Sequence, residues 1–599
     1  MPALIPDNET LSHLIRRALA EPRNEALLER VNGDWTPTST SRLLERVENL
    51  ACAIRDAGVQ QGDRVALIAH NCVDWIVCDF ATFFAGCVVV PIYPTQALDL
   101  TGYILRHSDA KLLFIDSAAS LQALKHVDID LPQAVVMGGE GIGTLAAFEA
   151  RGAALRVEHP ELPAAYEAEV RSSDLAVLIY TSGTTGNPKG VMLTHDNLGF
   201  DAQASLMFAD DEIVSGMDVL SVLPYSHIFE HTMIYIYLLA KTRYSICHDA
   251  NELLADLLAV QPQAMTAVPR IFDRVLAGVT GQAMKHGGLQ AKLVPWALGV
   301  GRDYMFAKTQ GRSPNPWLVA QYALAKRLVL DKVRAGLGLG RMEYFLSGSA
   351  ALHIDIAMTF LGLGVPILQG YGLTETSPVI TTSRLTLNKY GSVGSVIPGV
   401  EVTIAEDGEI LTRGRNIMRG YFNDSEATSQ AITDGWLHTG DVGEIDPSGF
   451  LRITDRKKEV FKTATGKYIS PARVESAIKR SVFVAQAMVV GDGRPHPAAL
   501  VCPNWDLVRV ELELPKDVSN EMLSERDDVR RFITREVRRN TDDLGSYEQI
   551  RRVIVIPREF SVENGELSPS MKIKRRVVEE RYRTAIDRAY QTDLKHASA

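Results

Sequence analysis

The sequence predicts an α/β fold, with a large N-terminal α/β domain that carries a small β-rich subdomain and a smaller C-terminal α+β domain. Three observations support this prediction. The 599 residues exceed one ordinary domain, and 46% hydrophobic with 23% charged residues is typical of globular proteins. Strand-like and helix-like runs alternate through the first part of the chain. After about residue 385 the pattern changes to short strands separated by turn residues.

The alternation is clearest between residues 60 and 116. The strand-like runs there are RVALIA, CVVVPIY and KLLFID, and the helix-like runs are VDWIVCDFATFFAGC and TQALDLTGYILRH. Strands that alternate with helices predict crossover connections and a parallel sheet covered on both faces. The same pattern returns in DVLSVLP, AMTAVP, RMEYFLSGS and GVPILQGYG, so the predicted α/β domain is large.

The later part of the chain predicts two further units. The segments GVEVTIAEDGEILTRG and GEIDPSGFLRITD favour a β-rich subdomain over about residues 385–456. Beyond it, VAQAMVVGDGRPHPAALVCP is typical of strands and DDVRRFITREVRRN of a charged amphipathic helix. We therefore divide the chain into an N-terminal domain of residues 1–456 and a C-terminal domain of residues 457–599.

Charge and composition exclude several classes of protein. The 63 Lys and Arg against 73 Asp and Glu give a net charge of -10, so nucleic acid is not expected as a partner. The six cysteines form no CxxC pattern, which indicates a reducing compartment. The N-terminus lacks the pattern of a signal peptide. Asp79 interrupts the most apolar stretch, Trp75 to Val90, which predicts a core helix and a strand rather than a membrane span.

Residues 281–341 differ from the rest of the chain in charge. This segment holds ten Lys or Arg residues but only Asp303 and Asp331 as acids, a net charge of +8. One interpretation is a solvated helical insertion, and the other is a surface that faces anions or a membrane. We therefore expect a cytoplasmic protein, with residues 281–341 as the candidate peripheral contact with the inner face of the membrane.

A glycine- and hydroxyl-rich loop follows the apolar run LAVLIY. It reads YTSGTTGNPKG from Tyr180 to Gly190. Glycines let backbone N–H groups converge on an anion, hydroxyls add donors, and lysine adds positive charge. The pattern is not a Walker A loop, because Pro188 precedes the lysine and Gly190 follows it. We predict a phosphate-binding loop formed by Thr181, Ser182, Gly183, Thr184, Thr185, Gly186 and Lys189.

Six further motifs follow in order along the chain. They are LPYSHIFEHT (223–232), SGSAAL (347–352), QGYGLTET (369–376), DGWLHTGDVG (434–443), ITDRKKEVFKTATGKYISPARVE (453–475) and SPSMKIKRR (568–576). Together with the loop they resemble the adenylate-forming (AMP-binding) enzyme superfamily. DGWLHTGDVG and the following GFLRITDRKK resemble bacterial long-chain fatty acyl-CoA synthetases. The resemblance implies ATP, Mg²⁺ and CoA as requirements and a mobile C-terminal domain.

The resemblance also implies roles for residues that would hold the nucleotide. Glu375 would bind Mg²⁺ beside the phosphates, and Thr374 would contact the α-phosphate. Asp441 would accept hydrogen bonds from the ribose, with Arg456 as a second ribose or phosphate contact. Adenine would lie against a slot formed by Gly348, Ser349, Ala350, Gln369, Gly370 and Tyr371, the last stacking on the ring. SGSAAL replaces a second Gly and an Ala-Pro found in many relatives.

The C-terminal motifs imply two arrangements of that domain about a hinge at Lys458. In the first, Lys572 bridges the fatty carboxylate and the α-phosphate, although Lys574 is an alternative because SPSMKIKRR lacks the usual Thr-Gly-Lys. In the second, the loop with Lys462 and Gly466 faces the site and admits the CoA thiol. His227, in LPYSH, would position the substrate or gate the channel. The apolar run HTMIYIYLLA after it fits either a core helix or the wall of an acyl tunnel.

The most complete hypothesis is an ATP-dependent ligase that converts a long-chain fatty acid to acyl-AMP and then transfers the acyl group to CoA, releasing AMP and diphosphate. One alternative is an acyl-AMP ligase that loads a carrier protein instead of CoA. An alternative of another class is a non-catalytic regulatory protein that binds nucleotide or acyl ligand. Against this last hypothesis, the chain keeps Lys189, Glu375 and Lys572.

Overall fold

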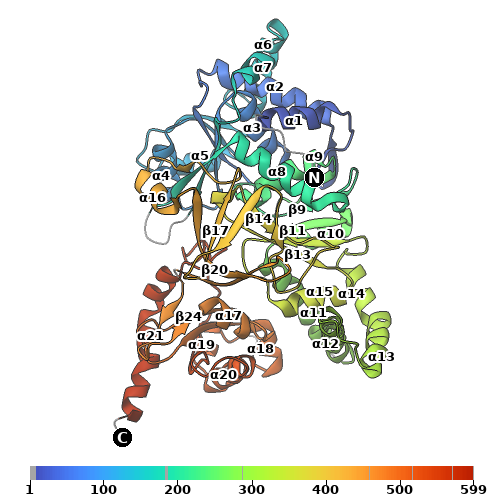
Figure 1. Ribbon diagram of the computed structural model, residues 1–599, viewed down its shortest axis with the longest axis vertical. Coiled ribbons are helices and arrows are strands. Elements are labelled where there is room, and N and C mark those ends of the chain that lie inside the picture. The colour runs from blue at the N-terminus through green and yellow to red at the C-terminus, as the bar shows by residue number, and fades with distance from the viewer. Residues whose placement is uncertain are drawn as a thin grey trace.

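The computed structural model describes residues 9–139, 141–181, 187–286, 288–457, 459–515, 517–568 and 571–597. The fold is α/β, with a large N-terminal part and a smaller C-terminal part that lies below it in Figure 1 (orange to red). The predicted fold class is therefore confirmed, and the boundary between residues 456 and 457 remains a prediction.

A seven-stranded sheet contains the first predicted βαβ units. Its strand order is β18-β8-β7-β4-β3-β5-β6, and β6, β5, β3, β4 and β7 run parallel. The strands are β3 (Arg64–Ile68), β4 (Val88–Ile92), β5 (Ala110–Ile115), β6 (Gln133–Val136), β7 (Leu175–Thr181), β8 (Lys189–Thr194) and β18 (Gly420–Tyr421). Helices in this part of the chain are α2 (Thr40–Asp56), α3 (Val73–Phe84), α4 (Leu98–Ser108), α5 (Ala118–Leu124), α6 (Leu145–Glu158) and α7 (Leu162–Glu169).

The most apolar stretch of the sequence is α3 followed by β4, as predicted. Trp75, Phe80 and Phe83 on α3 are fully buried, and so is Asp79. The carboxylate of Asp79 accepts from Tyr235 Oη at 3.2 Å and lies 2.9 Å from Nε2 of the buried His231. These polar partners explain how one acidic residue is tolerated inside a core helix.

A nine-stranded sheet carries the second half of the large domain. Its order is β15-β14-β13-β12-β11-β9-β10-β1-β2, parallel from β1 through β13 and antiparallel at both edges. The strands are β1 (Leu27–Val31), β2 (Asp34–Thr38), β9 (Asp218–Ser221), β10 (Arg243–Ile246), β11 (Ala264–Ala267), β12 (Tyr344–Ser347), β13 (Ile367–Gly372), β14 (Val379–Thr382) and β15 (Ser395–Val396). Helices around it include α1 (Leu11–Ala20), α8 (His195–Ala209), α9 (Ile228–Leu239), α10 (Leu253–Val260) and α15 (Ile354–Gly362).

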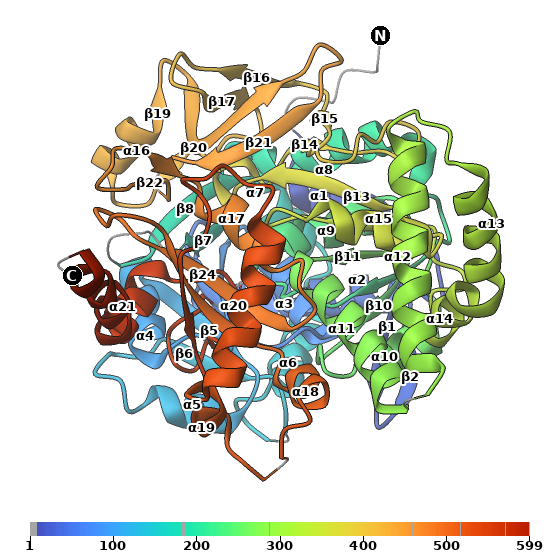
Figure 2. The same ribbon diagram turned by 90° about the horizontal axis from the view of Figure 1, so that it is seen from below.

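The basic segment falls within a group of helices between β11 and β12. These are α11 (Pro269–His286), α12 (Gln290–Thr309), α13 (Pro316–Ala325), the π-helical turn η2 (Lys326–Leu330) and α14 (Asp331–Gly336). Both views place α13 at the outer edge of the molecule (Figures 1 and 2). Among the described residues, no helix combines the length and apolar character needed to cross a membrane.

Antiparallel strands follow the nine-stranded sheet along the chain. They are β16 (Val400–Ile404), β17 (Glu409–Gly414), β19 (Ile432–Thr433), β20 (Trp436–Ile445) and β21 (Leu451–Arg456), with α16 (Ser425–Ala431) between them. The C-terminal part has a three-stranded sheet of β24 (Val484–Val490), β25 (Ala498–Pro503) and β26 (Arg552–Val555) and a small pair of β22 (Phe461–Lys462) and β23 (Tyr468–Ile469). Its helices are α17 (Pro471–Ile478), α18 (Trp505–Glu511), α19 (Asn520–Ser524), α20 (Asp527–Thr541) and α21 (Arg575–Ala597).

Candidate active site

A cavity of about 2090 Å³ lies where the ends of the central strands meet the C-terminal part. Ligands of open α/β sheets bind at the carboxyl ends of parallel strands, and this cavity is at that place. The N-terminal domain lines it from the ends of β7, β12 and β13, and the C-terminal part adds residues around 572. The predicted residues that line it are Thr181, Lys189, His227, Gly348, Ser349, Gly370, Tyr371, Thr374, Glu375, Arg456, Lys462 and Lys572.

Tyr371 and Asp441 form one hydrogen-bonded group at the cavity. The Tyr371 hydroxyl donates to Asp441 Oδ2 at 2.8 Å, and Arg456 Nε lies 3.1 Å from Asp441 Oδ1. Both side chains are largely buried. Burial raises the pKa of Asp441, and the Arg456 charge opposes that rise. Each carboxylate oxygen has a second lone pair, so Asp441 still has the capacity to accept from two hydroxyl groups.

Glu375 lies in the short 3₁₀ helix η3 (Thr374–Thr376), directly after β13. The hydroxyl of Tyr421 donates to Glu375 Oε1 at 2.8 Å, and Lys189 Nζ lies 5.1 Å from the Tyr421 ring centre. Burial, followed by the charge of Glu375, raises the pKa of Tyr421, so the phenol remains a proton donor. Lys189 is also 3.7 Å from Asp424.

The residues around Glu375 fit a Mg²⁺ ion that is shared with phosphates. Among the described residues, no group of three or more His, Cys, Asp or Glu side chains is arranged to hold a metal ion. Mg²⁺ commonly takes one or two protein carboxylates and fills its other positions with water and phosphate oxygens. Glu375 supplies one such carboxylate, and Lys189 lies nearby, against the ring of Tyr421.

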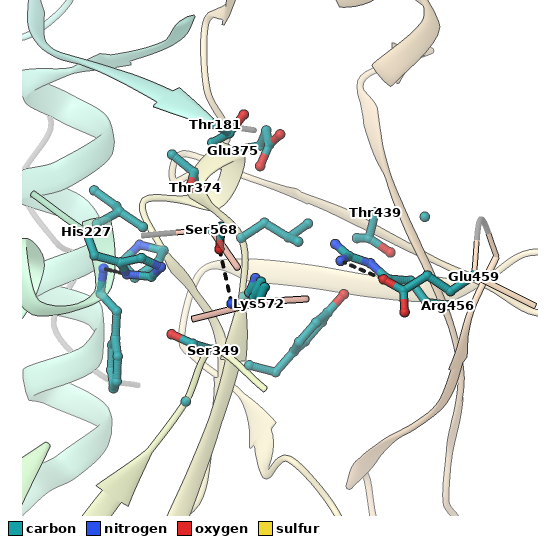
Figure 3. A pocket seen from close by; sticks show the side chains of 18 of the residues that line it. Thr181, His227, Ser349, Thr374, Glu375, Thr439, Arg456, Glu459, Ser568 and Lys572 are labelled. Atoms are coloured by element: carbon teal, nitrogen blue, oxygen red, sulfur yellow. Dashed lines mark hydrogen bonds and ion pairs between the residues drawn. The ribbon is translucent and has the colours of Figure 1, made fainter. Parts of the chain in front are cut away.

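Lys572 is held on a tight turn of the C-terminal part. The Lys572 amide donates to Ser568 Oγ at 3.1 Å, the Ser568 amide donates to the Lys572 carbonyl at 2.8 Å, and Leu567 pairs with Ile573. Figure 3 shows the Lys572 side chain between His227 and Arg456. The Lys572 side chain is exposed and faces the open space of the cavity.

The charges around Lys572 are mixed. Burial, and then the Arg456 charge, lower the pKa of Lys572, whereas Asp441, Glu375 and Glu459 oppose that change. The ammonium group of Lys572 therefore lies in the field of one guanidinium group and three carboxylates. Lys574, the alternative from the sequence, also lines the cavity, and its backbone amide donates to the Glu566 carbonyl at 2.8 Å.

His227 is the N-cap residue of α9. Its Nδ1 accepts from the Phe229 amide at 3.2 Å, which assigns the ring proton to Nε2. Burial, with a contribution from the Lys572 charge, lowers the pKa of His227 to about 3. The ring is therefore neutral near pH 7 and presents an N–H donor rather than a base.

Helix α9 contributes to both the core and the cavity. Phe229, Met233 and Ile236 line the cavity at helical spacing, whereas Tyr235 and Tyr237 on the other faces are buried in the core. Further apolar lining comes from Ala209 and Ile213 near the end of α8 and from Leu346 on β12. One face of this helix therefore lines the cavity, and its other faces belong to the core.

The structure describes Ala350, Gln369 and Gly466 among the remaining predicted residues. Gln369 is buried and donates to the Ser392 carbonyl at 3.2 Å, and Ala350 is exposed. Gly466 has a φ of +81° in the turn that joins β22 to β23, beside Lys462. The predicted loop residues Ser182, Gly183, Thr184, Thr185 and Gly186 and the hinge residue Lys458 lie outside the described residues.

Sequence reasoning missed Tyr421, although it contacts two predicted residues. Tyr421 belongs to the two-residue strand β18, which pairs with β8 at the end of the glycine-rich loop. The signal was weak, a tyrosine within RGYFND. Ser568 was overlooked as well, although it stands in the motif that carries Lys572.

Two sequence profiles of known enzymes together match most of the chain. The sequence profile of AMP-binding enzymes matches residues 14–422, and that of the AMP-binding enzyme C-terminal domain matches residues 458–594. The chain belongs to the AMP-binding enzyme family. A long-chain-fatty-acid–CoA ligase, FadD15 of Mycobacterium tuberculosis, is 32% identical to this family member over 569 residues, 94% of each chain. The human long-chain-fatty-acid–CoA ligase ACSBG2 is 28% identical, covering 94% of this chain and 90% of that protein.

Solved structures share the fold of this AMP-binding enzyme. The adenylation domain of a carboxylate reductase from Mycobacterium chelonae superposes with a TM-score of 0.75 at 21% identity, covering 97% of this chain and 91% of that one. A fatty acyl CoA synthetase of Mycobacterium tuberculosis gives a TM-score of 0.61 at 21% identity, with 96% and 99% covered.

Proposed function

We propose that this protein is a long-chain fatty acid–CoA ligase that works through an acyl-AMP intermediate. The observation that carries the proposal is the convergence of Lys572, Glu375 and the Tyr371–Asp441–Arg456 group on one cavity with an apolar wall. Relatives that cover 94% of the chain bear the same name. ATP, Mg²⁺ and CoA are the expected requirements.

In the first half-reaction a carboxylate oxygen attacks the α-phosphorus of ATP. The new bond joins the acyl oxygen to phosphorus, and the bond to the β-phosphate oxygen breaks and releases diphosphate. Lys572 would place its positive charge between the carboxylate and the α-phosphate, and Lys189 would offset charge on the leaving group. Mg²⁺, when bound, would be held by Glu375 and would neutralise phosphate charge.

Neutral His227 and the Tyr371–Asp441–Arg456 group would orient the reactants. The Nε2–H of His227 is available to donate a hydrogen bond to the substrate carboxylate without removing a proton. Tyr371 would stack on adenine while Asp441 and Arg456 hold the ribose. The apolar residues of α8, α9 and β12 would bury the acyl chain, which accounts for a fatty rather than a polar acid.

In the second half-reaction the CoA thiol attacks the acyl carbon. A carbon–sulfur bond forms, the carbon–oxygen bond to AMP breaks, and the thiol proton is released. In the arrangement described above, Lys572 lies at the cavity, where it would contact the substrate carboxylate. We therefore expect the C-terminal part to rotate about residue 458 before the thiol approaches the acyl carbon. The loop with Lys462 and Gly466 would then face the site.

One product analysis tests this assignment. The protein is incubated with palmitate, ATP and Mg²⁺, with and without CoA, and products are identified by mass spectrometry. We expect palmitoyl-CoA and AMP with CoA present. Acyl adenylate that persists despite CoA would instead favour transfer to a carrier protein, and absence of both products would refute the ligase.

The Lys572→Ala variant tests the two-step scheme. We expect loss of adenylation by about 100- to 1000-fold, the usual cost of removing one transition-state contact of this kind. Formation of thioester from supplied acyl-AMP should be retained, because Lys572 is then outside the site. An equal loss in both half-reactions would contradict this role.

We also propose that residues 281–341 contact an anionic membrane. Trp317 and Leu324, two turns apart on α13, are 71% and 52% exposed, and Leu328 in η2 is 45% exposed. A water-facing helix normally carries polar residues on its outer face. The exposed cations Lys292, Arg312, Arg327 and Lys332 lie in the same segment, so apolar and positive surface occur together, as anionic bilayers require.

Flotation with vesicles tests this contact. The protein should float with phosphatidylglycerol vesicles at low salt and much less with phosphatidylcholine or at high salt. Trp317→Ala with Leu324→Ser should reduce flotation, whereas Met522→Ser, at a 66% exposed methionine on α19, should not. Flotation that is absent, or equal in the two variants, would remove this proposal.

A further inference from the structure

Arg270 connects the large domain to the turn that carries Lys572. It is the second residue of α11, which begins directly after β11. Its Nη2 lies 3.1 Å from Glu559 Oε2, and its Nη1 lies 3.9 Å from the sulfur of Met571. Glu559 and Met571 both belong to the C-terminal part, and Met571 is the residue before Lys572.

The position of Arg270 in its own helix is electrostatically unfavourable. The first turn of a helix carries partial positive charge, so a cation is disfavoured there. Burial lowers the pKa of Arg270, and Glu559 opposes that change. A guanidinium group in such a place indicates a role beyond its helix, and the contacts of Arg270 with Glu559 and Met571 across the domain boundary supply one.

The partners of Arg270 are themselves firmly held. Arg558, next to Glu559, makes a two-pronged ion pair with the buried Glu566 at 2.7 and 3.0 Å. The Phe560 amide donates to Gln486 Oε1 at 2.6 Å, which fixes the other side of Glu559. Met571 has a φ of +64°, a left-handed conformation that a non-glycine residue adopts only when its surroundings impose it.

We propose that Arg270 is a positioning residue for the first half-reaction, which rests on the function proposed above. By binding Glu559 and Met571 together, it fixes the turn that presents Lys572 to the cavity. The same contacts join the large domain to the C-terminal part, so they must break when that part rotates. Arg270 therefore favours adenylation and contributes nothing to attack by the thiol.

Two variants test the proposal, Arg270→Met and Glu559→Gln. Each half-reaction is measured separately, the first as diphosphate exchange into ATP and the second as thioester formation from supplied acyl-AMP and CoA. We expect Arg270→Met to lower the exchange rate constant by about 10- to 100-fold, the usual range for a small misplacement of a reacting group. Glu559→Gln should cause a smaller loss, because the Met571 contact remains. Thioester formation should stay within twofold of wild type in both.

The matched control is Arg274→Met, one turn further along α11 at an exposed position. It should leave both half-reactions within twofold, and circular dichroism should show that all variants fold. Unchanged exchange in Arg270→Met and Glu559→Gln, or equal losses in the two half-reactions, would overturn the proposal. If the wild-type protein catalyses neither half-reaction, the failure belongs to the proposed function instead.

Discussion

The hydroxyl of Tyr421 donates a hydrogen bond to Glu375, the carboxylate that we propose as the Mg²⁺ ligand. Tyr421→Phe removes the 2.8 Å hydrogen bond to Glu375 Oε1 but keeps the aromatic ring beside Lys189. Hydrogen bonds to charged groups contribute about 1.5–3 kcal/mol. At about 1.4 kcal/mol per factor of ten, the adenylation rate should fall roughly 10- to 100-fold. Loss of such a supporting contact typically weakens metal affinity by a similar factor of about 10 to 100.

Diphosphate exchange at a series of Mg²⁺ concentrations measures both effects. We expect Tyr421→Phe to need more Mg²⁺ for half-maximal exchange, with part of the rate recovered at high Mg²⁺. Tyr421→Leu removes the ring as well and should lose more, because Lys189 then loses its cation–π contact. If Tyr421→Phe keeps the wild-type rate and the wild-type Mg²⁺ dependence, the hydroxyl does not orient Glu375.

Two further predictions concern buried groups. Asp79→Ala should lower the free energy of unfolding of the large domain by about 3–5 kcal/mol, because it leaves His231 and Tyr235 without their buried acceptor. Asp79→Asn should cause a smaller loss. Urea midpoints that match wild type would contradict this prediction. The pKa of His227 is lowered from 6.5 to about 3 in the native state. Between these two pH values the unfolded chain binds a proton at His227 and the native state does not. The free energy of unfolding therefore falls as the pH falls through that window. At pH 5 His227 lowers the free energy of unfolding by about 2 kcal/mol. His227→Gln should remove this contribution from the change in urea midpoint between pH 7 and pH 5.

Local patterns predicted many elements of this fold, and the family resemblance predicted many residues that line its cavity. The run LAVLIY became the buried strand β7, and the glycine-rich segment after it ends at Lys189 on the cavity wall. The family resemblance, rather than a local pattern, implied that Glu375 and Lys572 share one site, and both line the cavity although 197 positions separate them. The local predictions succeed because strand ends and turns have local sequence signals.

Contacts between distant short segments had no such signal. Tyr421 reaches Glu375 through a two-residue strand, too short to show a period of two. Arg270 and Glu559 are 289 positions apart and meet only because the C-terminal part is seated on α11. Apolar residues occur all around α9, so the sequence alone does not separate those that line the cavity from those of the core.

The contacts that seat the C-terminal part are compatible with the rotation that we propose for it. The side chains of Arg270 and Glu559 are 30% and 50% exposed, and ion pairs at such exposure contribute about 1 kcal/mol or less. Glu459, just after residue 458, is similarly placed between Arg456 at 3.7 Å and Arg575 at 3.3 Å. Such weak polar contacts hold the orientation that places Lys572 in the cavity, and each is weak enough to break in the rotation that we propose after release of diphosphate. A large apolar interface would have fixed the lysine more firmly and closed the route for the thiol.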